Sequence, residues 1–255
     1  MRLRTLLRAA LIPLVAGAAA LSVSSPVAAA QEPGQVGPAI VGGGQASGDF
    51  PWIASLQVNG SHGCGGSLIS SQWVVTAAHC IPQQALRLRI GSKTWQSGGV
   101  LTSASRMIKH PNYSGQAGPY DIALIRLAQP VQNAPIQIAD SSPAAGTGVT
   151  LYGWGQTCPQ RGCEPRPPSN LKQLNTRIDP DSRCQGIQGQ SELCVYSTNY
   201  QTACYGDSGG PLVVQGMLAG ATSRAGHNSP SCGTGDTIYT DVVAHRQWIA
   251  SVTGA

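Results

Sequence analysis

The stretch CYGDSGGPL, residues 204–212, decides how this 255-residue chain is interpreted. It places one serine, Ser208, between an aspartate and two glycines, shortly after a cysteine. A serine flanked by glycines is common in loops, so the segment could be an ordinary turn. It predicts a catalytic nucleophile only if distant parts of the chain supply a base, an orienting carboxylate and a substrate pocket.

The composition predicts an all-β protein. The chain contains 32 Gly and 18 Pro, only 11% of its residues are charged, and it has no long stretch of helical periodicity. Short apolar runs separated by turn residues predict strands. These are expected at 52–58, 67–69, 73–76, 86–90, 122–127, 149–152, 174–178, 193–196, 211–214, 218–222 and 237–240. The segment 241–254 is expected to form a C-terminal helix that ends near Gly254.

The N-terminus has the pattern of an export signal. Basic residues precede a short apolar run, and VAAAQ (27–31) offers small residues for cleavage after Ala30. The run contains Pro13 and is shorter than the roughly 20 apolar residues that span a bilayer, which argues against a retained anchor. We therefore expect a signal peptide at 1–30, a short propeptide at 31–39, and a secreted, extracellular product.

Charge and cysteine content narrow the class further. The net charge is +5 for the whole chain and +3 for residues 40–255, without any run of Lys or Arg, so neither nucleic acid nor a membrane is an expected partner. An even number of cysteines in an exported chain predicts four disulfides, and no CxxC pair suggests zinc. All eight cysteines follow the signal segment: Cys64, Cys80, Cys158, Cys163, Cys184, Cys194, Cys204 and Cys232.

Two further motifs could supply the chemistry that Ser208 needs. TAAHC (76–80) contains His79, and YDIALIRL (120–127) places Asp121 at the head of an apolar strand. A serine hydroxyl needs a base, imidazole can take and return a proton near neutral pH, and a carboxylate can hold the imidazole in the useful tautomer. Glycines beside the serine allow a sharp turn that exposes backbone N–H groups. Taken singly, the three residues would be a buried imidazole, a strand cap and a loop hydroxyl.

Five motifs occur together in a fixed order: IVGG (40–43), CGGSLI (64–69), WVVTAAHC (73–80), DIALIRL (121–127) and GDSGGPL (206–212). With these motifs the chain resembles the trypsin/chymotrypsin family of serine endopeptidases from Ile40 to the C-terminus. The resemblance implies two six-stranded antiparallel β-barrels, at about 40–145 and 146–255, with the active site between them and a C-terminal helix. GDSGG also fits the α/β-hydrolase pattern G-x-S-x-G, but that fold places its acid and histidine after the serine, where only 47 residues remain.

The resemblance assigns roles residue by residue. It makes His79 the general base and acid, Asp121 its orienting carboxylate and Ser208 the nucleophile, with the N–H groups of Gly206 and Ser208 as the oxyanion hole. Ser223 matches the family's serine beside the triad.

The resemblance also implies activation by cleavage after Ala39, whose new Ile40 ammonium would pair with Asp207. Trypsin-like zymogens usually have Arg or Lys before the cut, so Ala39 predicts an activating protease that prefers small residues, or self-processing.

The implied disulfides are Cys64–Cys80, Cys184–Cys194 and Cys204–Cys232, which leaves Cys158 with Cys163. No Asp or Glu lies between Asp49 and Asp121, so the calcium loop of many relatives is not expected, nor is another metal or a cofactor.

The resemblance predicts a pocket that differs from the pocket of trypsins. Thr202 stands where trypsins have an aspartate at the pocket floor, and Thr237 stands where they have a glycine. The wall is expected at Ser223–Ala225, with Arg224 where relatives often have Trp, and Tyr205 at the rim. This pattern predicts a non-basic preference, for small or medium apolar or for aromatic residues. A shift of one residue would instead bring the carboxylate of Asp236 into the wall and restore a basic preference.

Three function classes follow from these residues. The first is a secreted endopeptidase, monomeric, whose partners are protein or peptide substrates, an activating protease and protein inhibitors. The second is a catalytically impaired homologue that acts as a binding protein, for which Arg224 and the unusual pocket are the only support. The third is an esterase, because the same acyl chemistry serves both reactions.

Overall fold

The structure is a computed structural model that describes residues 40–254 except residue 117. The predicted signal peptide (1–30) and propeptide (31–39) lie outside the described residues. Within the described part of the chain, no helix is long and apolar enough to cross a membrane.

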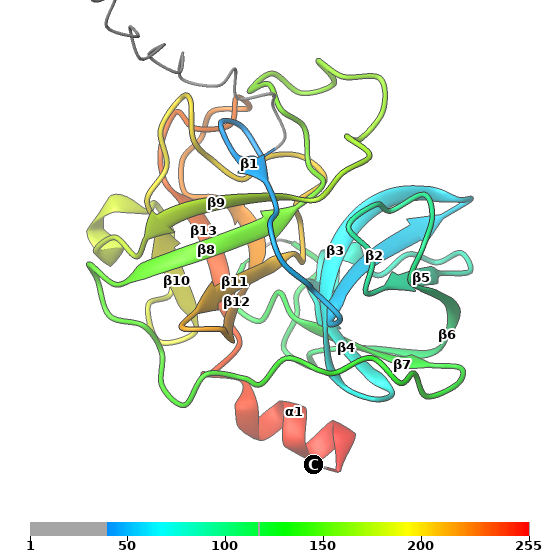
Figure 1. Cartoon of the computed structure of the whole chain (residues 1–255). Coiled ribbons are helices and arrows are strands. Elements are labelled where there is room, and N and C mark those ends of the chain that lie inside the picture. The colour runs from blue at the N-terminus through cyan, green and yellow to red at the C-terminus, as the bar shows by residue number, and fades with distance from the viewer. Residues whose placement is uncertain (1–39, 117, 255) are drawn as a thin grey trace, which may run out of the picture. The chain divides into compact units, whose positions relative to one another are not determined.

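The first half of the described chain forms a closed antiparallel barrel in the order β2-β3-β4-β7-β6-β5 (Figure 1). Apolar side chains from alternate positions fill its interior, because successive residues of a strand point to opposite faces. The strands are β2 (Ile53–Val58), β3 (Ser61–Ser70), β4 (Trp73–Thr76), β5 (Arg87–Ile90), β6 (Val100–Lys109) and β7 (Ala123–Leu127).

The second half, together with β1 from the start of the described chain, forms a seven-stranded antiparallel sheet in the order β1-β9-β8-β11-β12-β13-β10. The bridge Ile178↔Val195 and the hydrogen bond from Asp179 N to Cys194 O (2.8 Å) join the end of β9 to β10. Strands β8 to β13 therefore form the second six-stranded barrel that the family resemblance implies, and β1 adds a short strand to β9. The strands are β1 (Gly44–Gln45), β8 (Gly148–Gly153), β9 (Lys172–Arg177), β10 (Glu192–Val195), β11 (Pro211–Val214), β12 (Met217–Ala225) and β13 (Thr237–Asp241).

A shared apolar cluster joins the two barrels. Val75 and Leu124 of the first barrel pack in one cluster with Leu218 and Ala221 of the second. The C-terminal helix α1 (Arg246–Thr253) adds Ile249 to this cluster, and it ends at Gly254 in the left-handed conformation (φ +74°) that favours glycine. The prediction of a terminal helix is confirmed, although it begins five residues later than expected.

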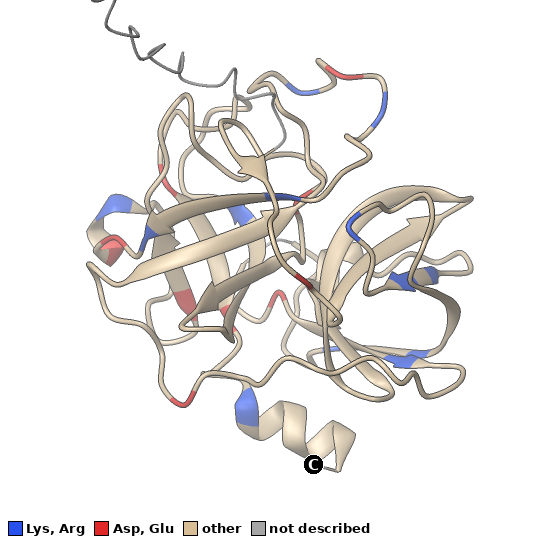
Figure 2. Cartoon of the chain, in the orientation of Figure 1, with Lys and Arg blue, Asp and Glu red and all other residues tan. Residues whose placement is uncertain are grey.

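Charge is distributed unequally between the two halves. Figure 2 shows Lys and Arg on the first barrel, whose segment 50–120 contains no Asp or Glu. Apart from the contact between His79 and Asp121, the ion pairs of the described residues all lie in the second half, at Arg177–Asp179, Arg183–Asp179, Arg183–Asp236 and Arg224–Glu192.

Candidate active site

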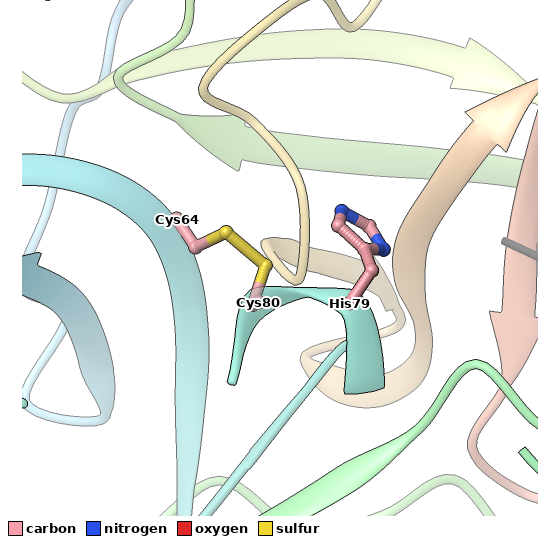
Figure 3. Close-up of side chains that lie close together, drawn as sticks. All are labelled: Cys64, His79 and Cys80. Carbon is pink, nitrogen blue, oxygen red and sulfur yellow. A yellow bond between two sulfur atoms is a disulfide. The ribbon is translucent and has the colours of Figure 1, made fainter. Parts of the chain in front are cut away.

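His79 lies on the short 3₁₀ helix η1 (Ala78–Cys80), which follows β4. The disulfide Cys64–Cys80 ties η1 to β3, and the imidazole stands next to it (Figure 3). The imidazole and the two sulfurs offer ligand atoms within 4.8 Å of one another. Since a sulfur in a disulfide cannot act as a thiolate ligand, this group anchors the histidine and does not make a metal site.

Asp121 directs both the ring and the backbone of His79. Its side chain is completely buried at the head of β7, where Oδ1 accepts the N–H of His79 (2.9 Å) and Oδ2 lies 2.7 Å from His79 Nδ1. The hydroxyl of Ser223 also donates to Oδ2, over 2.7 Å. Because a carboxylate oxygen can only accept, Nδ1 carries the hydrogen and Nε2 is left with a lone pair that can take a proton.

Ser208 is held between the two barrels. Its carbonyl accepts the N–H of Gly65 on β3 (2.8 Å), while the next residue, Gly209, donates to the carbonyl of Thr222 on β12 (2.8 Å). Gly209 has φ +71°, and a Cβ atom there would lie 2.1 Å from Thr76 Oγ1, so only glycine fits this approach. Gly65 follows Cys64, the partner of Cys80, and Thr222 precedes Ser223, so the serine loop is attached to both supports of His79.

The backbone N–H groups on either side of Asp207 are free. The amides of Asp207, Gly209 and Gly210 donate to backbone carbonyls, whereas those of Gly206 and Ser208, like that of Tyr205, have no acceptor among the described residues. Gly206 adopts φ +97°, which glycine alone tolerates well. The loop can therefore direct two donors at an oxygen that gains negative charge.

His62 binds the backbone of the loop 204–210, here called the oxyanion loop, at Gly206. Its sequence context did not indicate this role. Its Nε2 lies 3.0 Å from the carbonyl of Gly206, and its Nδ1 lies 2.9 Å from the hydroxyl of Ser55. The carbonyl can only accept, so Nε2 carries the hydrogen and Nδ1 accepts from Ser55. Burial lowers the pKa of His62 to about 4, which keeps the ring neutral near pH 7.

Asp207, the residue before Ser208 in this loop, is buried. Its carboxylate accepts the N–H groups of Gly155 (2.8 Å) and Cys204 (2.9 Å). No cation pairs with it among the described residues, and desolvation raises its pKa to about 7. Ile40 is also buried, and the next residue, Val41, pairs with Thr202, two residues before Cys204.

A cavity of about 270 Å³ opens beside Ser208. No Asp or Glu is among the residues that line it. Five of the six predicted pocket residues contribute to its surface, namely Tyr205, Ser223, Arg224, Ala225 and Thr237. The sixth, Thr202, is buried and lies behind Thr237, with the two hydroxyl oxygens 3.3 Å apart. Thr237, rather than Thr202, therefore faces the cavity.

Asp236 points away from this cavity. Its Oδ1 accepts the N–H of Ser197 (3.0 Å), and its Oδ2 lies 3.6 Å from Nε of Arg183. Since neighbouring residues of an extended chain face opposite sides, placing Thr237 in the wall puts Asp236 behind it. The alternative register, with a carboxylate in the pocket wall, does not occur in the structure.

Arg224 lines the cavity, and its guanidinium is bound by Glu192, a residue that the sequence pattern did not indicate. Its Nη1 and Nη2 both bind the carboxylate of Glu192 on β10, the latter over 2.9 Å, and Nη2 also donates to the carbonyl of Gly186 (3.0 Å). Glu192 directly precedes the predicted strand at 193–196, as Asp121 precedes the one at 122–127, and this was its only signal in the sequence. Its partner lies 32 residues away in sequence, so the pairing depends on the fold.

The four disulfides are Cys64–Cys80, Cys158–Cys163, Cys184–Cys194 and Cys204–Cys232, as the resemblance implies. Cys184–Cys194 also lies close to Asp236, but its sulfurs are oxidised and cannot bind a metal as thiolates. Cys204–Cys232 joins two residues of the cavity wall.

Comparison with known proteins agrees with this geometry. The family model described as Trypsin matches residues 40–249. Trypsin alpha of Drosophila melanogaster is 36% identical over 234 residues, covering 85% of this chain and 88% of the relative. Trypsin alpha-4 of Lucilia cuprina is 35% identical, covering 81% and 84%. The solved structure of neuropsin, a serine protease expressed in the limbic system of mouse brain, has a TM-score of 0.72 and 32% identity, covering 80% of this chain and 94% of that one.

Proposed function

Because the chain belongs to the trypsin family of serine proteases, we propose that it is an endopeptidase that works through an acyl-enzyme on Ser208. The observation that carries the proposal is the contact of 2.7 Å between Asp121 Oδ2 and His79 Nδ1, which leaves Nε2 as the base. In the first step Ser208 Oγ bonds to the scissile carbonyl carbon while Nε2 takes the hydroxyl proton. The same nitrogen then gives this proton to the leaving amine, and a water molecule repeats the two steps to release the acid.

Charge on the substrate oxygen is stabilised by the free N–H groups of Gly206 and Ser208. Their peptide planes are held in place, because the carbonyl of Tyr205 accepts the N–H of Gln156 (2.8 Å) and the carbonyl of Asp207 accepts the N–H of Gly210 (2.8 Å). His62 also binds the carbonyl of Gly206, between these two planes. Such preorganised donors lose little free energy to rearrangement as the tetrahedral intermediate forms. His62 thus acts as a positioning residue for the oxyanion loop.

Activation is proposed to occur by cleavage between Ala39 and Ile40. The unpaired carboxylate of Asp207 supports this step, because an ammonium placed beside it would stabilise its ionised form. Ile40 also has φ +47°, a strained value for a β-branched residue, and a cut before it would relieve this strain. The Ala39→Pro variant, which is meant to block cleavage at this junction, should remain inactive. A second variant with an artificial protease site at the same junction should become active once it is cleaved. Full activity of either variant without cleavage would contradict the proposal.

The primary specificity is proposed to be non-basic, for small or medium apolar or for aromatic residues. The cavity beside Ser208 has no carboxylate in its wall, and a buried lysine or arginine side chain would have no counter-charge. Thr237 also lines the cavity, where its side chain takes up space that a glycine would leave open. The relatives are named trypsins, so a peptide-library profile must include Arg and Lys; a strong basic preference would refute this part of the proposal.

Export to the extracellular space is proposed from the pattern of residues 1–30. N-terminal sequencing of material from the culture medium should find Gln31 before activation and Ile40 after it. If the protein were found only in the cell-associated fraction, with Met1 still at its N-terminus, this would argue against export.

A fluorophosphonate probe tests the proposed catalysis directly. It should label the processed wild-type protein at Ser208 and leave the Ser208→Ala variant unlabelled. Equal labelling of both proteins, or of neither, would support a binding protein built on this fold. Peptide and ester substrates compared on the same preparation then separate an endopeptidase from an esterase.

A further inference from the structure

The ion pair between Arg224 and Glu192 shapes the cavity wall next to the triad. The Arg224 side chain is 18% exposed and that of Glu192 is not exposed at all. Arg224 lines the cavity, whereas Glu192 does not. Of the pair, Arg224 is therefore the residue that a substrate in the cavity can reach, whereas the Glu192 carboxylate is buried.

The donors of Arg224 are only partly used. A guanidinium has five N–H groups, and three of them are directed at Glu192 Oε1, Glu192 Oε2 and the carbonyl of Gly186. The N–H on Nε and one N–H on Nη1 have no acceptor among the residues that the structure describes. Glu192 is well satisfied in comparison, because its Oε2 also accepts the N–H of Gln188 (2.8 Å).

The surroundings of Arg224 favour an acceptor from outside the chain. No carboxylate lines the cavity, and His227, the other basic side chain there, has its pKa lowered mainly by burial. Arg224 directly follows Ser223, which binds Asp121, and both residues are on β12. The same strand binds the residue after Ser208, because Gly209 donates to the carbonyl of Thr222, so Arg224 lies close to the reacting serine.

We propose that Arg224 is a specificity-determining residue that selects substrates with a carboxylate side chain on one of the residues preceding the scissile bond. Glu192 is its positioning residue: it fixes the guanidinium in advance, so that binding a substrate carboxylate costs little side-chain entropy. This inference rests on the proposed endopeptidase function and names its substrate class. It predicts an acidic preference beside the primary pocket, in addition to the residue that the pocket itself takes.

The test uses peptides that differ at one position. Each has Glu, Gln or Lys at the second, third or fourth residue before the scissile bond. For the wild type, kcat/KM should be about tenfold higher with Glu than with Gln at one of these positions, and lower still with Lys, as a charge-assisted hydrogen bond implies. Equal cleavage of the three peptides at every position, or a preference for Lys, would overturn the inference.

Variants assign the preference to the ion pair. Arg224→Met should abolish the difference between Glu and Gln, mainly through KM, while Arg126→Met, on the exposed surface of β7, should retain it. Glu192→Gln should weaken the preference without abolishing it. If Arg224→Met does not fold, Arg224→Lys keeps the charge but loses the planar fork and should retain only part of the preference; an unchanged preference would contradict the role of Arg224.

Fluorophosphonate labelling distinguishes the two levels of failure. A protein that labels at Ser208 but shows no acidic preference would refute this inference and leave the proposed endopeptidase intact. A processed protein that does not label would refute the proposed function itself, and the inference with it.

Discussion

Protonation of His62 should make this protein less stable as the pH falls from about 6.5 to 4. The folded state holds the ring neutral with a pKa of about 4, against an ordinary value of 6.5. In this range the unfolded chain binds a proton that the folded chain does not, so the free energy of unfolding decreases with falling pH. At 1.36 kcal/mol per pKa unit, the full shift corresponds to about 3 kcal/mol, lost progressively from about pH 6.5 and completely near pH 4.

The perturbation that isolates this effect is His62→Gln. A glutamine amide can donate to the carbonyl of Gly206 and accept from Ser55, but it does not titrate. Both proteins should carry Ser208→Ala, which prevents self-digestion during the measurement. Urea unfolding at pH 7, 5.5 and 4 then gives the change in unfolding free energy with pH for each protein.

The expected result is that His62→Gln loses about 3 kcal/mol less than its parent between pH 7 and pH 4. Asp207 and His245 also have shifted pKa values, but they are present in both proteins and cancel in the difference. His227→Gln, at a partly exposed histidine, is the matched control and should change the slope much less. Equal pH dependence in the parent and in His62→Gln would show that His62 is not held neutral by the fold, and the argument would fail.

Three further predictions concern the triad, the pocket and the activation site. Asp121→Asn should reduce kcat on the order of 10⁴-fold, the size known for the equivalent change in this family, because an amide no longer holds Nδ1 of His79 protonated; steady-state kinetics with intact fluorophosphonate labelling would check it. Thr237→Gly should raise kcat/KM for peptides with a large apolar primary residue about tenfold relative to alanine peptides, and an unchanged ratio would place the pocket floor elsewhere. In the uncut Ser208→Ala chain the pKa of Asp207 is raised from 3.8 to about 7. The protonated carboxyl therefore stabilises the folded state below pH 3.8, and this contribution, about 4 kcal/mol in all, is lost as the pH rises through 7. Asp207→Asn should remove this pH dependence of the unfolding free energy, measured by urea unfolding.

The all-β class and the triad motifs could be recognised in the sequence because their signals are local, and the two barrels followed from the family resemblance of these motifs. The motifs around His79, Asp121 and Ser208 each combine the reactive residue with small or apolar neighbours, and their order is specific. Most strands were predicted close to their observed bounds, but β3 (Ser61–Ser70) begins six residues before the predicted strand at 67–69, because its residues 61–66 contain three glycines and little apolar pattern. β6 (Val100–Lys109) was missed because most of its residues are exposed or only partly buried, so its sequence has no regular alternation.

The details of the pocket depend on contacts between distant residues. Whether Thr202, Asp236 or Thr237 faces the cavity is decided by the register of β13, and a shift of one residue would reverse the answer. The role of His62 depends on a carbonyl 144 residues away. Neither relation leaves a pattern in the neighbouring sequence, so the preference of the pocket could be predicted only from resemblance.

The bulge in β12 connects the catalytic and the selective parts of the site. Thr222 pairs with Tyr239 and Arg224 pairs with Ile238, so the intervening Ser223 has no partner on β13. This extra residue frees Ser223 to turn its hydroxyl to Asp121, while Arg224 extends to Glu192 on β10. The same irregularity therefore orients the triad carboxylate and the guanidinium, and a change at Glu192 should reach the triad only through Arg224 and Ser223.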